Sequence, residues 1–172
     1  MTMVLDGDGL VSYGVPNTAT LKAATGSSVD FTIPAGVTPR RITLLVSGVS
    51  LSSTGQLLVQ LGTAGGIVNT GYVSTGGYMY AAGGTGITSS TAGFCLTGGS
   101  TSAYTWSGVV TIATLGSNNW VSGGNLGNSA STASVFSSGG QLSNAGGAIT
   151  TLRITNTSTD TFDAGNFNIL YE

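Results

Sequence analysis

Short runs of alternating apolar and polar residues, separated by Gly, Ser and Thr, make up most of the chain. In residues 28–34, SVDFTIP, the apolar residues Val29, Phe31 and Ile33 occupy every second position. Side chains two positions apart point to the same face of an extended strand. This run therefore predicts a β-strand with one face buried in a core.

The next apolar run, residues 40–51 (RRITLLVSGVSL), is long enough for a central strand. Its alternation puts Ile42 and Leu44 on one face, and Gly48 is typical of a β-bulge. Residues 55–62, GQLLVQLG, follow after a short polar stretch, SSTG. Because two apolar runs around a short polar turn favour a hairpin, we expect these two strands to pair.

The rest of the chain continues the same pattern, and helix signals are scarce because Gly recurs throughout. The further predicted strands are residues 67–74, 93–98, 104–115, 119–124, 134–143, 148–158 and 166–172. A hairpin turn, GSNN, joins the third and fourth of these. Three stretches rich in small residues, 62–66, 74–86 and 122–146, are predicted to be surface loops, which at such lengths are usually functional or mobile.

Many short strands at regular spacing are typical of an all-β fold, here an antiparallel β-sandwich of jelly-roll type. We expect residues 28–172 to form the sandwich and residues 1–27 to form a short N-terminal arm. At the other end of the chain, Phe167, Ile169 and Tyr171 continue the alternation almost to the last residue. Because chain ends fray unless they are tied down, this end is predicted to be a paired strand.

The composition changes the picture by removing whole classes of function. The chain has 172 residues, with 29 Gly, only four basic and six acidic residues, one Cys and no His. Scattered basic residues and a net charge of −2 argue against nucleic-acid binding. No apolar run reaches the roughly 18–20 residues of a membrane span, and the first residues, MTMVLDGDGL, lack the basic start of a signal peptide. We expect no disulfide, no transition-metal site and no cofactor.

Titratable groups that could support catalysis are few. Asp160 and Asp163 in STDTFDAG are spaced like a candidate glycosidase pair, but the stretch is more typical of a turn whose carboxylate caps backbone N–H groups. Arg153 is a candidate partner for one of these acids. The stretch LDGDGL, residues 5–10, lacks the later ligands of a calcium loop and is typical of a β-turn. With Cys95 predicted to be a small buried hydrophobe, we expect no enzymatic activity.

Aromatic residues offer a better case for ligand binding. Tyr78 and Tyr80 lie in a Gly-rich stretch, and Trp120 follows the GSNN turn. Exposed aromatic rings with nearby amide and hydroxyl groups are typical of sugar-binding surfaces, so Asn125 completes the candidate set. The alternative is packing in the core or between subunits, and it applies most to Tyr72, Trp106 and Trp120.

Two segments, residues 28–80 and 149–172, resemble a module found at the ends of tail-fibre and related virion proteins of tailed phages. The resemblance lies in IP…RRIT…SGVS, in LLVQLG…GYVS and in the terminal DTFDAG…NILYE. It implies a phage structural protein, of tail-fibre or fibre-tip type, that forms a homotrimer. The implied location is the virion, after assembly in the host cytoplasm, with a host-surface polysaccharide as ligand. Other virion proteins would contact residues 1–27, and the alternative role is a capsid decoration protein on the head.

Overall fold

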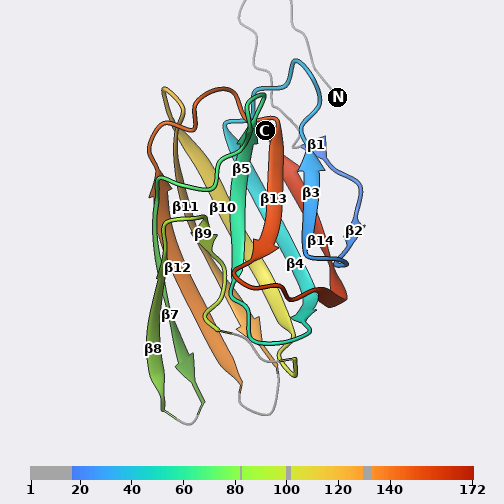
Figure 1. Cartoon of the computed structure of the whole chain (residues 1–172), viewed down its shortest axis with the longest axis vertical. Helices are drawn as coiled ribbons and strands as arrows, with labels where there is room; N and C mark the ends of the chain where they lie inside the picture. The colour runs from blue at the N-terminus through green and yellow to red at the C-terminus, as the bar shows by residue number, and fades with distance from the viewer. Residues whose placement is uncertain (1–16, 82, 100–101, 130–132) are drawn as a thin grey trace, which may run out of the picture.

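The computed structural model describes residues 17–81, 83–99, 102–129 and 133–172, and all structural statements concern these residues. Their regular secondary structure is entirely β, in two antiparallel sheets that form the two layers of a sandwich (Figure 1). This confirms the predicted fold class. The described residues include no helix long and apolar enough to cross a membrane.

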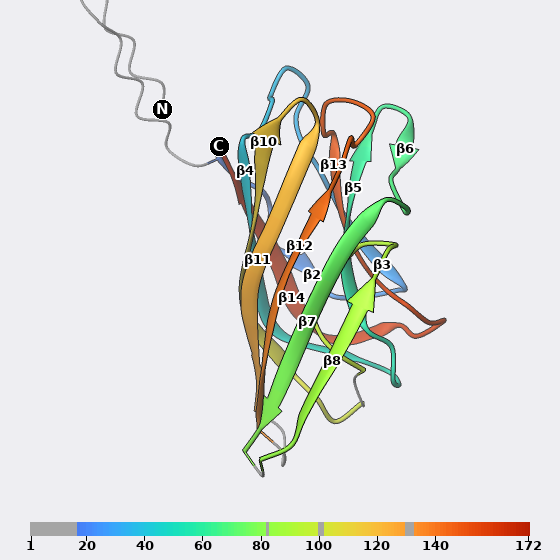
Figure 2. The same ribbon diagram turned by 90° about the vertical axis from the view of Figure 1, so that its left-hand side faces the viewer.

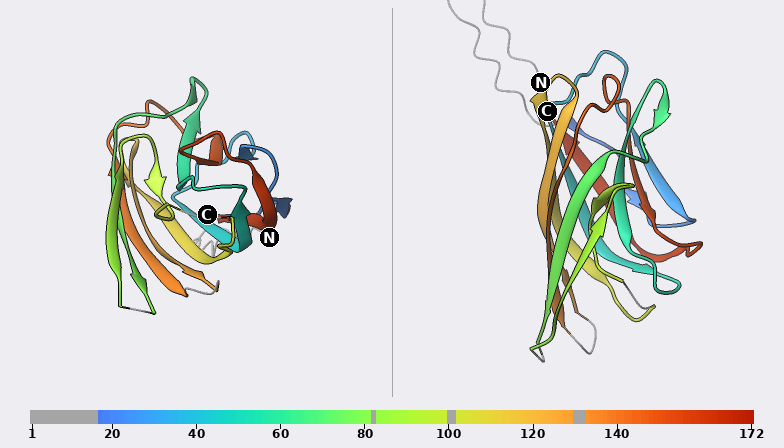
Figure 3. Two further views of the ribbon diagram at one scale, coloured as in Figure 1. Left: turned by 60° about the horizontal axis from the view of Figure 1, so that its bottom comes forward. Right: turned by 60° about the vertical axis from the view of Figure 1, so that its left-hand side comes forward.

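The larger sheet contains nine strands, which lie side by side in an order that mixes distant parts of the chain. The order is β1 (Asn17–Thr18), β14 (Phe162–Tyr171), β4 (Arg41–Leu51), β10 (Trp106–Gly116), β11 (Asn119–Asn128), β12 (Ser134–Leu142), β7 (Tyr72–Tyr80) and β8 (Thr85–Ser90), and β2 (Lys22–Ala23) also pairs with β14. In the left-hand view of Figure 3, this sheet curves around the interior of the sandwich.

The smaller sheet covers only part of the larger one. Its order is β3 (Ser28–Thr32), β13 (Thr151–Asn156), β5 (Leu57–Thr63) and β6 (Gly66–Ile67), and β9 (Phe94–Cys95) also pairs with β5. The far ends of β7, β8 and β12 extend beyond this second layer (Figure 1). The larger sheet therefore projects past the sandwich core at one end.

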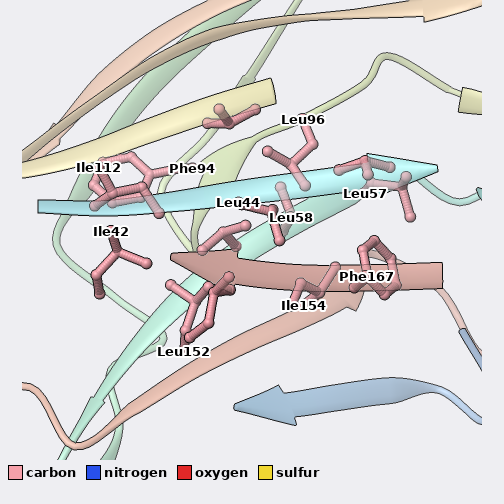
Figure 4. Packing of buried hydrophobic residues seen from close by; sticks show 14 of the residues in the cluster. Ile42, Leu44, Leu57, Leu58, Phe94, Leu96, Ile112, Leu152, Ile154 and Phe167 are labelled. Atoms are coloured by element: carbon pink, nitrogen blue, oxygen red, sulfur yellow. The ribbon is translucent and has the colours of Figure 1, made fainter. Parts of the chain in front are cut away.

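The core lies between the two sheets and consists of the alternating apolar residues that the sequence pattern singles out. Ile42 and Leu44 of β4 are fully buried and face Leu152 and Ile154 of β13 across the interior (Figure 4). Phe31 of β3 is buried in the same cluster. The predicted burial of these alternating positions is confirmed.

The C-terminal strand is held on both sides. β14 pairs with β4 along one edge and with β1 and β2 along the other. At its end the backbone N–H of Glu172 donates to the Arg41 carbonyl, and the Glu172 side chain forms an ion pair with Arg41. Phe167 and Ile169 are fully buried. The prediction of a paired terminal strand is confirmed.

The expected hairpin between residues 40–51 and 55–62 is wrong. β4 pairs with β14 and β10 in the larger sheet, whereas β5 pairs with β13, β6 and β9 in the smaller one. The SSTG stretch therefore carries the chain from one layer to the other. Gly48 has a φ of 61°, and the pairing register between β4 and β14 shifts around it, so the predicted irregularity is present.

The predicted loops 74–86 and 122–146 are also wrong, because most of these residues form β7, β8, β11 and β12. In stretch 62–66 only residues 64 and 65 form a turn, because the others belong to β5 and β6. Glycines in these strands make room for rings on neighbouring strands. A Cβ on Gly76 would lie 2.4 Å from the Phe136 ring, and one on Gly86 would lie 2.1 Å from Tyr78. High glycine content here supports strand packing and does not mark loops.

The GSNN hairpin is confirmed: β10 and β11 are joined by Ser117 and Asn118, which have φ values of 50° and 62°. Two consecutive positive φ values are typical of the tight turns that match strand twist. Of the expected arm, residues 17–27 contribute β1 and β2 to the larger sheet. The LDGDGL stretch lies outside the described residues.

Candidate binding surfaces

Five adjacent strands of the larger sheet, β10, β11, β12, β7 and β8, contain no charged residue. Between Arg41 and Arg153 the sequence has no Asp, Glu, Lys, Arg or His at all. That uncharged stretch supplies all five strands, which lie side by side in Figure 2. We call the outward side of these five strands the neutral face.

Small side chains cover most of the neutral face. One row across it, read from the strand register, runs Thr111, Gly123, Gly139, Thr75, Ser89. All five residues are exposed. The opposite side of β10, β11, β12 and β7 carries the buried residues of these strands, such as Ile112, Leu126, Phe136 and Tyr72. The neutral face is consequently low in relief and carries few long side chains that would lose conformational freedom on contact.

Exposed large apolar side chains concentrate on this face. The exposed fraction is 83% for Ile87 on β8 and 65% for Met79 on β7. Val73, Val109 and Val135 are also exposed and lie on the same side of the sheet by register. These five make up most of the seven large exposed apolar residues in the described chain. Exposed apolar residues gathered on one face, rather than scattered singly, indicate an interaction surface.

A shallow hollow of about 580 Å³ lies near one end of the neutral face. Met79 and Val135 form part of its lining, together with Ser107, Gly127 and Tyr80. The small residues on β10 and β11 leave the depression, and the larger ones on β7 and β12 form its side. The lining has hydroxyl and amide groups but no charged group among the described residues.

An aromatic cluster lies at the same end of the larger sheet. The ring centres of Tyr78 and Tyr80 are 4.7 Å apart, and those of Tyr104 and Trp106 are 6.1 Å apart in an edge-to-face contact. Burial raises the pKa of Tyr80, and the neighbouring Tyr78 raises it further. Tyr78, Tyr80 and Tyr104 are half-buried, so part of each ring remains accessible. Trp106 is buried and supports the cluster from the core.

The four residues of the predicted sugar-binding set do not come together. Tyr78 and Tyr80 share one end of β7, but Trp120 is paired through Leu142 to Tyr72 at the other end of that strand. At about 3.3 Å per residue, the two ends lie roughly 26 Å apart. Trp120 is also 5% exposed, so its ring is a packing residue.

Asn125 is exposed, but it lies on the neutral face, in register with Ser137 and Gly77. Tyr78 follows Gly77 in the strand and points to the other side of the sheet. The structure therefore keeps the two tyrosines as one candidate site and assigns Asn125 to a different surface.

The two candidate catalytic carboxylates are engaged in local hydrogen bonds. Asp160 Oδ2 accepts from the backbone N–H of Gly55 at 2.7 Å, and Asp163 accepts from the Ser50 hydroxyl. This agrees with the predicted capping role for a carboxylate in that turn. No group of three or more His, Cys, Asp or Glu side chains that could hold a metal ion occurs in the described part of the chain.

Arg153 does not pair with either of those acids, contrary to expectation. Its guanidinium binds both carboxylate oxygens of Asp30, at 2.8 Å and 2.7 Å. The two residues are direct cross-strand neighbours on β13 and β3, which explains the choice of partner. The hydrogen bonds to Asp30 raise the pKa of Arg153.

The lone cysteine behaves as predicted. Cys95 is buried between Ser74 and Gln56, and its thiol accepts a hydrogen bond from Gln56 Nε2 at 3.2 Å. Burial raises the pKa of the thiol, which disfavours the reactive thiolate.

Comparison of the chain with protein-family models, curated proteins and solved structures gave no match. The case for function therefore rests on the surfaces themselves. Sequence reasoning missed the neutral face and the part of Tyr104 in the aromatic cluster. The signal for the neutral face was present as the long interval without charge between Arg41 and Arg153.

Proposed function

We propose that the protein is a structural subunit of a tailed-phage virion, of tail-fibre or fibre-tip type, that assembles with copies of itself and binds a host-surface glycan. The observation that carries the proposal is the neutral face: five adjacent strands without a charged residue and with exposed apolar side chains. Charged residues are depleted at the centres of protein interfaces, and this surface has that composition. The resemblance of residues 28–80 and 149–172 to phage fibre ends supports the virion context.

The glycan-binding part of the proposal rests on the aromatic cluster. Tyr78 and Tyr80 present tilted, half-buried rings whose centres lie 4.7 Å apart. Such rings offer apolar area for the C–H face of a sugar and polar edges for its hydroxyl groups. Identical weak sites on several subunits then give strong binding to a repeating surface polysaccharide.

Localisation on virions tests the structural role. Gold-labelled antibodies against the protein should bind to the tail tips of purified phage virions that encode the protein. Label on the head would favour the capsid decoration role instead. Virions without any label, in a preparation whose other structural proteins are detected, would contradict both.

Binding to an array of bacterial surface polysaccharides tests the recognition role. Tyr80→Ala removes one ring from the cluster and should lower the signal at least tenfold on any polysaccharide that the wild type binds. Thr32→Ala, on the exposed side of β3, is the matched control and should bind like the wild type. No binding by the wild type to any polysaccharide, or equal binding by Tyr80→Ala, would contradict the glycan-binding part alone.

A further inference from the structure

We propose that the neutral face is the surface through which copies of this chain pack against one another. The inference rests on the proposed function, because it names the contact surface of the assembled subunit. The occupant of the face is a second copy of the same chain, and three features of the structure support this assignment.

The first feature is the distribution of charge. Lys22, Asp30, Arg153 and Asp160 lie on or beside the smaller sheet and β2. Asp163 and Glu172 lie in or directly after β14, and Arg41 begins β4. Arg40 lies next to the turn between β10 and β11, at the border of the neutral face. A surface without charge meets its own copy without like-charge repulsion. A nucleic acid or a strongly charged protein would instead need complementary charges, which these five strands lack.

The second feature is the size of the face. Five strands at about 4.8 Å spacing give a width of roughly 24 Å. Four of them have nine to eleven residues, which at about 3.3 Å each gives a length of roughly 30 Å, and β8, with six residues, is shorter. The product is about 700 Å² on each copy, or about 1,400 Å² when two copies meet, which falls in the range of about 1,200–2,000 Å² typical of specific interfaces.

The third feature is the free edge next to the face. β8 is the last strand of the larger sheet and pairs only with β7. Exposed edges in monomeric proteins usually carry Lys, Pro or a bulge that discourages pairing. Residues 85–90, TGITSS, have no Lys or Pro and expose Ile87 on the neutral face. The edge and the face thus form one continuous surface that is open to a neighbouring copy.

Charge insertion tests the assignment. Thr111→Lys and Thr75→Lys each place an ammonium group on the neutral face, at exposed positions of β10 and β7. Native mass spectrometry of the wild type at micromolar concentration should give a multiple of 17.0 kDa, and each variant should give mainly the monomer. Thr32→Lys on β3 makes the same chemical change elsewhere and should keep the wild-type mass. Circular dichroism spectra equal to that of the wild type would verify that the variants are folded.

A milder probe covers the case in which a Lys variant does not fold. Thr75→Cys puts a small thiol on the neutral face, and the native Cys95 is buried, so background labelling by a maleimide should be slow. Labelling of Thr75→Cys should slow at least fivefold when the protein concentration rises from nanomolar to micromolar. Thr32→Cys should label at the same rate throughout.

Several outcomes would overturn the proposal. These are a monomeric wild type at every concentration, an unchanged oligomer in both Lys variants, or equal dissociation of the Thr32→Lys control. A monomer whose polysaccharide binding is lost in Thr111→Lys would assign the face to glycan instead. A monomeric wild type would also overturn the self-assembly stated in the proposed function, whereas an unchanged oligomer in both Lys variants would overturn only the choice of surface. The virion location is tested separately by the antibody labelling.

Discussion

The hydroxyl of Tyr72 joins the two sheets, and its removal should measurably weaken the fold. Tyr72 on β7 accepts a hydrogen bond from the backbone N–H of Leu61 on β5 at 2.8 Å and donates one to the Val68 carbonyl at 3.1 Å. Tyr72→Phe keeps the ring and its edge-to-face contact with Phe94, whose centre is 5.0 Å away. The substitution therefore isolates the hydroxyl.

The cost follows from what is left without a partner. The N–H of Leu61 is buried and loses its acceptor, and such a loss typically costs about 1–3 kcal/mol of unfolding free energy. For a domain of this size, about 1 kcal/mol corresponds to a fall of roughly 2–4 °C in Tm. Urea unfolding at pH 7, followed by tryptophan fluorescence, should show the loss as a lower midpoint with an unchanged slope.

The pH dependence gives a second, independent signature of the same hydroxyl. Burial raises the pKa of Tyr72 from 10.0 to about 12 in the folded protein. Because the unfolded chain releases this proton near pH 10 and the folded chain holds it until near pH 12, stability falls as the pH rises through that window. Ionisation of Tyr72 should lower the unfolding free energy of the wild type by about 2–3 kcal/mol between pH 10 and 12. Tyr72→Phe should not show this loss, because it has no hydroxyl to ionise.

The free-energy difference between wild type and Tyr72→Phe should thus be constant from pH 7 to 9 and should shrink between pH 10 and 12. A difference that stays constant up to pH 11.5, or a variant as stable as the wild type at pH 7, would refute the assigned role of the hydroxyl.

Three further changes test other parts of the fold. Gly76→Ala should destabilise by about 1–3 kcal/mol in urea unfolding, because its Cβ meets the Phe136 ring at 2.4 Å and the Ser137 carbonyl oxygen at 2.9 Å. In a Phe136→Ala background the loss should become smaller, because only the contact with the Ser137 carbonyl remains. Fully additive effects of the two substitutions would contradict the contact with the ring. Asp30→Asn weakens the ion pair with Arg153. The Arg153 side chain is 34% exposed and that of Asp30 is 40% exposed, so the loss of unfolding free energy in a thermal melt should stay below about 1 kcal/mol. A larger loss would contradict the interpretation of this contact as an ordinary surface ion pair. Deletion of residues 167–172 removes most of the pairing of β14 with β4. The variant should therefore show no cooperative thermal transition in circular dichroism. A soluble deletion variant that melts like the wild type would contradict the structural role of the C-terminal strand.

Local alternation was enough to predict several strands, among them β3, β4, β5, β10 and β14. Phe31 and Ile42 fall into the core because side chains two apart share a face, and this rule needs no knowledge of the partner strand. The terminal strand was predictable for the same reason. Its apolar residues alternate up to Tyr171, and an exposed row of that kind would be unfavourable.

Pairing between strands was not predictable from the same pattern. SSTG suits a hairpin turn and a crossing between sheets equally well, and β4 finds its neighbours far away along the chain, in β10 and β14. The glycine-rich stretches were misleading for another physical reason. Gly76 and Gly86 look like loop residues until the rings of Phe136 and Tyr78, which occupy the space above them, are known.

The candidate site was predictable only where it depends on neighbours in sequence. Tyr78 and Tyr80 are two apart on one strand, so their proximity follows from strand geometry. Trp120 and Tyr104 are placed by long-range pairing. This pairing puts Trp120 at the far end of the sheet, and it brings Tyr104, with its sequence neighbour Trp106, to the end that carries Tyr80.

Charged residues lie outside the five strands of the neutral face. Ion pairs can therefore stabilise the subunit while the neutral face stays available for contact between copies. The smaller sheet holds the cross-strand pair of Arg153 with Asp30, and the β4–β14 side of the larger sheet holds the ion pair of Arg41 with Glu172. These charged groups are used within the subunit. The neutral face has no ion pairs to make or break on contact. Salt screens interactions between exposed charges, with a screening length of about 10 Å at 0.1 M. The proposed association of two copies through the neutral face should therefore depend little on salt. An interface of this kind would persist through changes of ionic strength. The same property follows from the composition that first set this chain apart, since Gly, Ser and Thr fill the strands where most proteins place charged side chains.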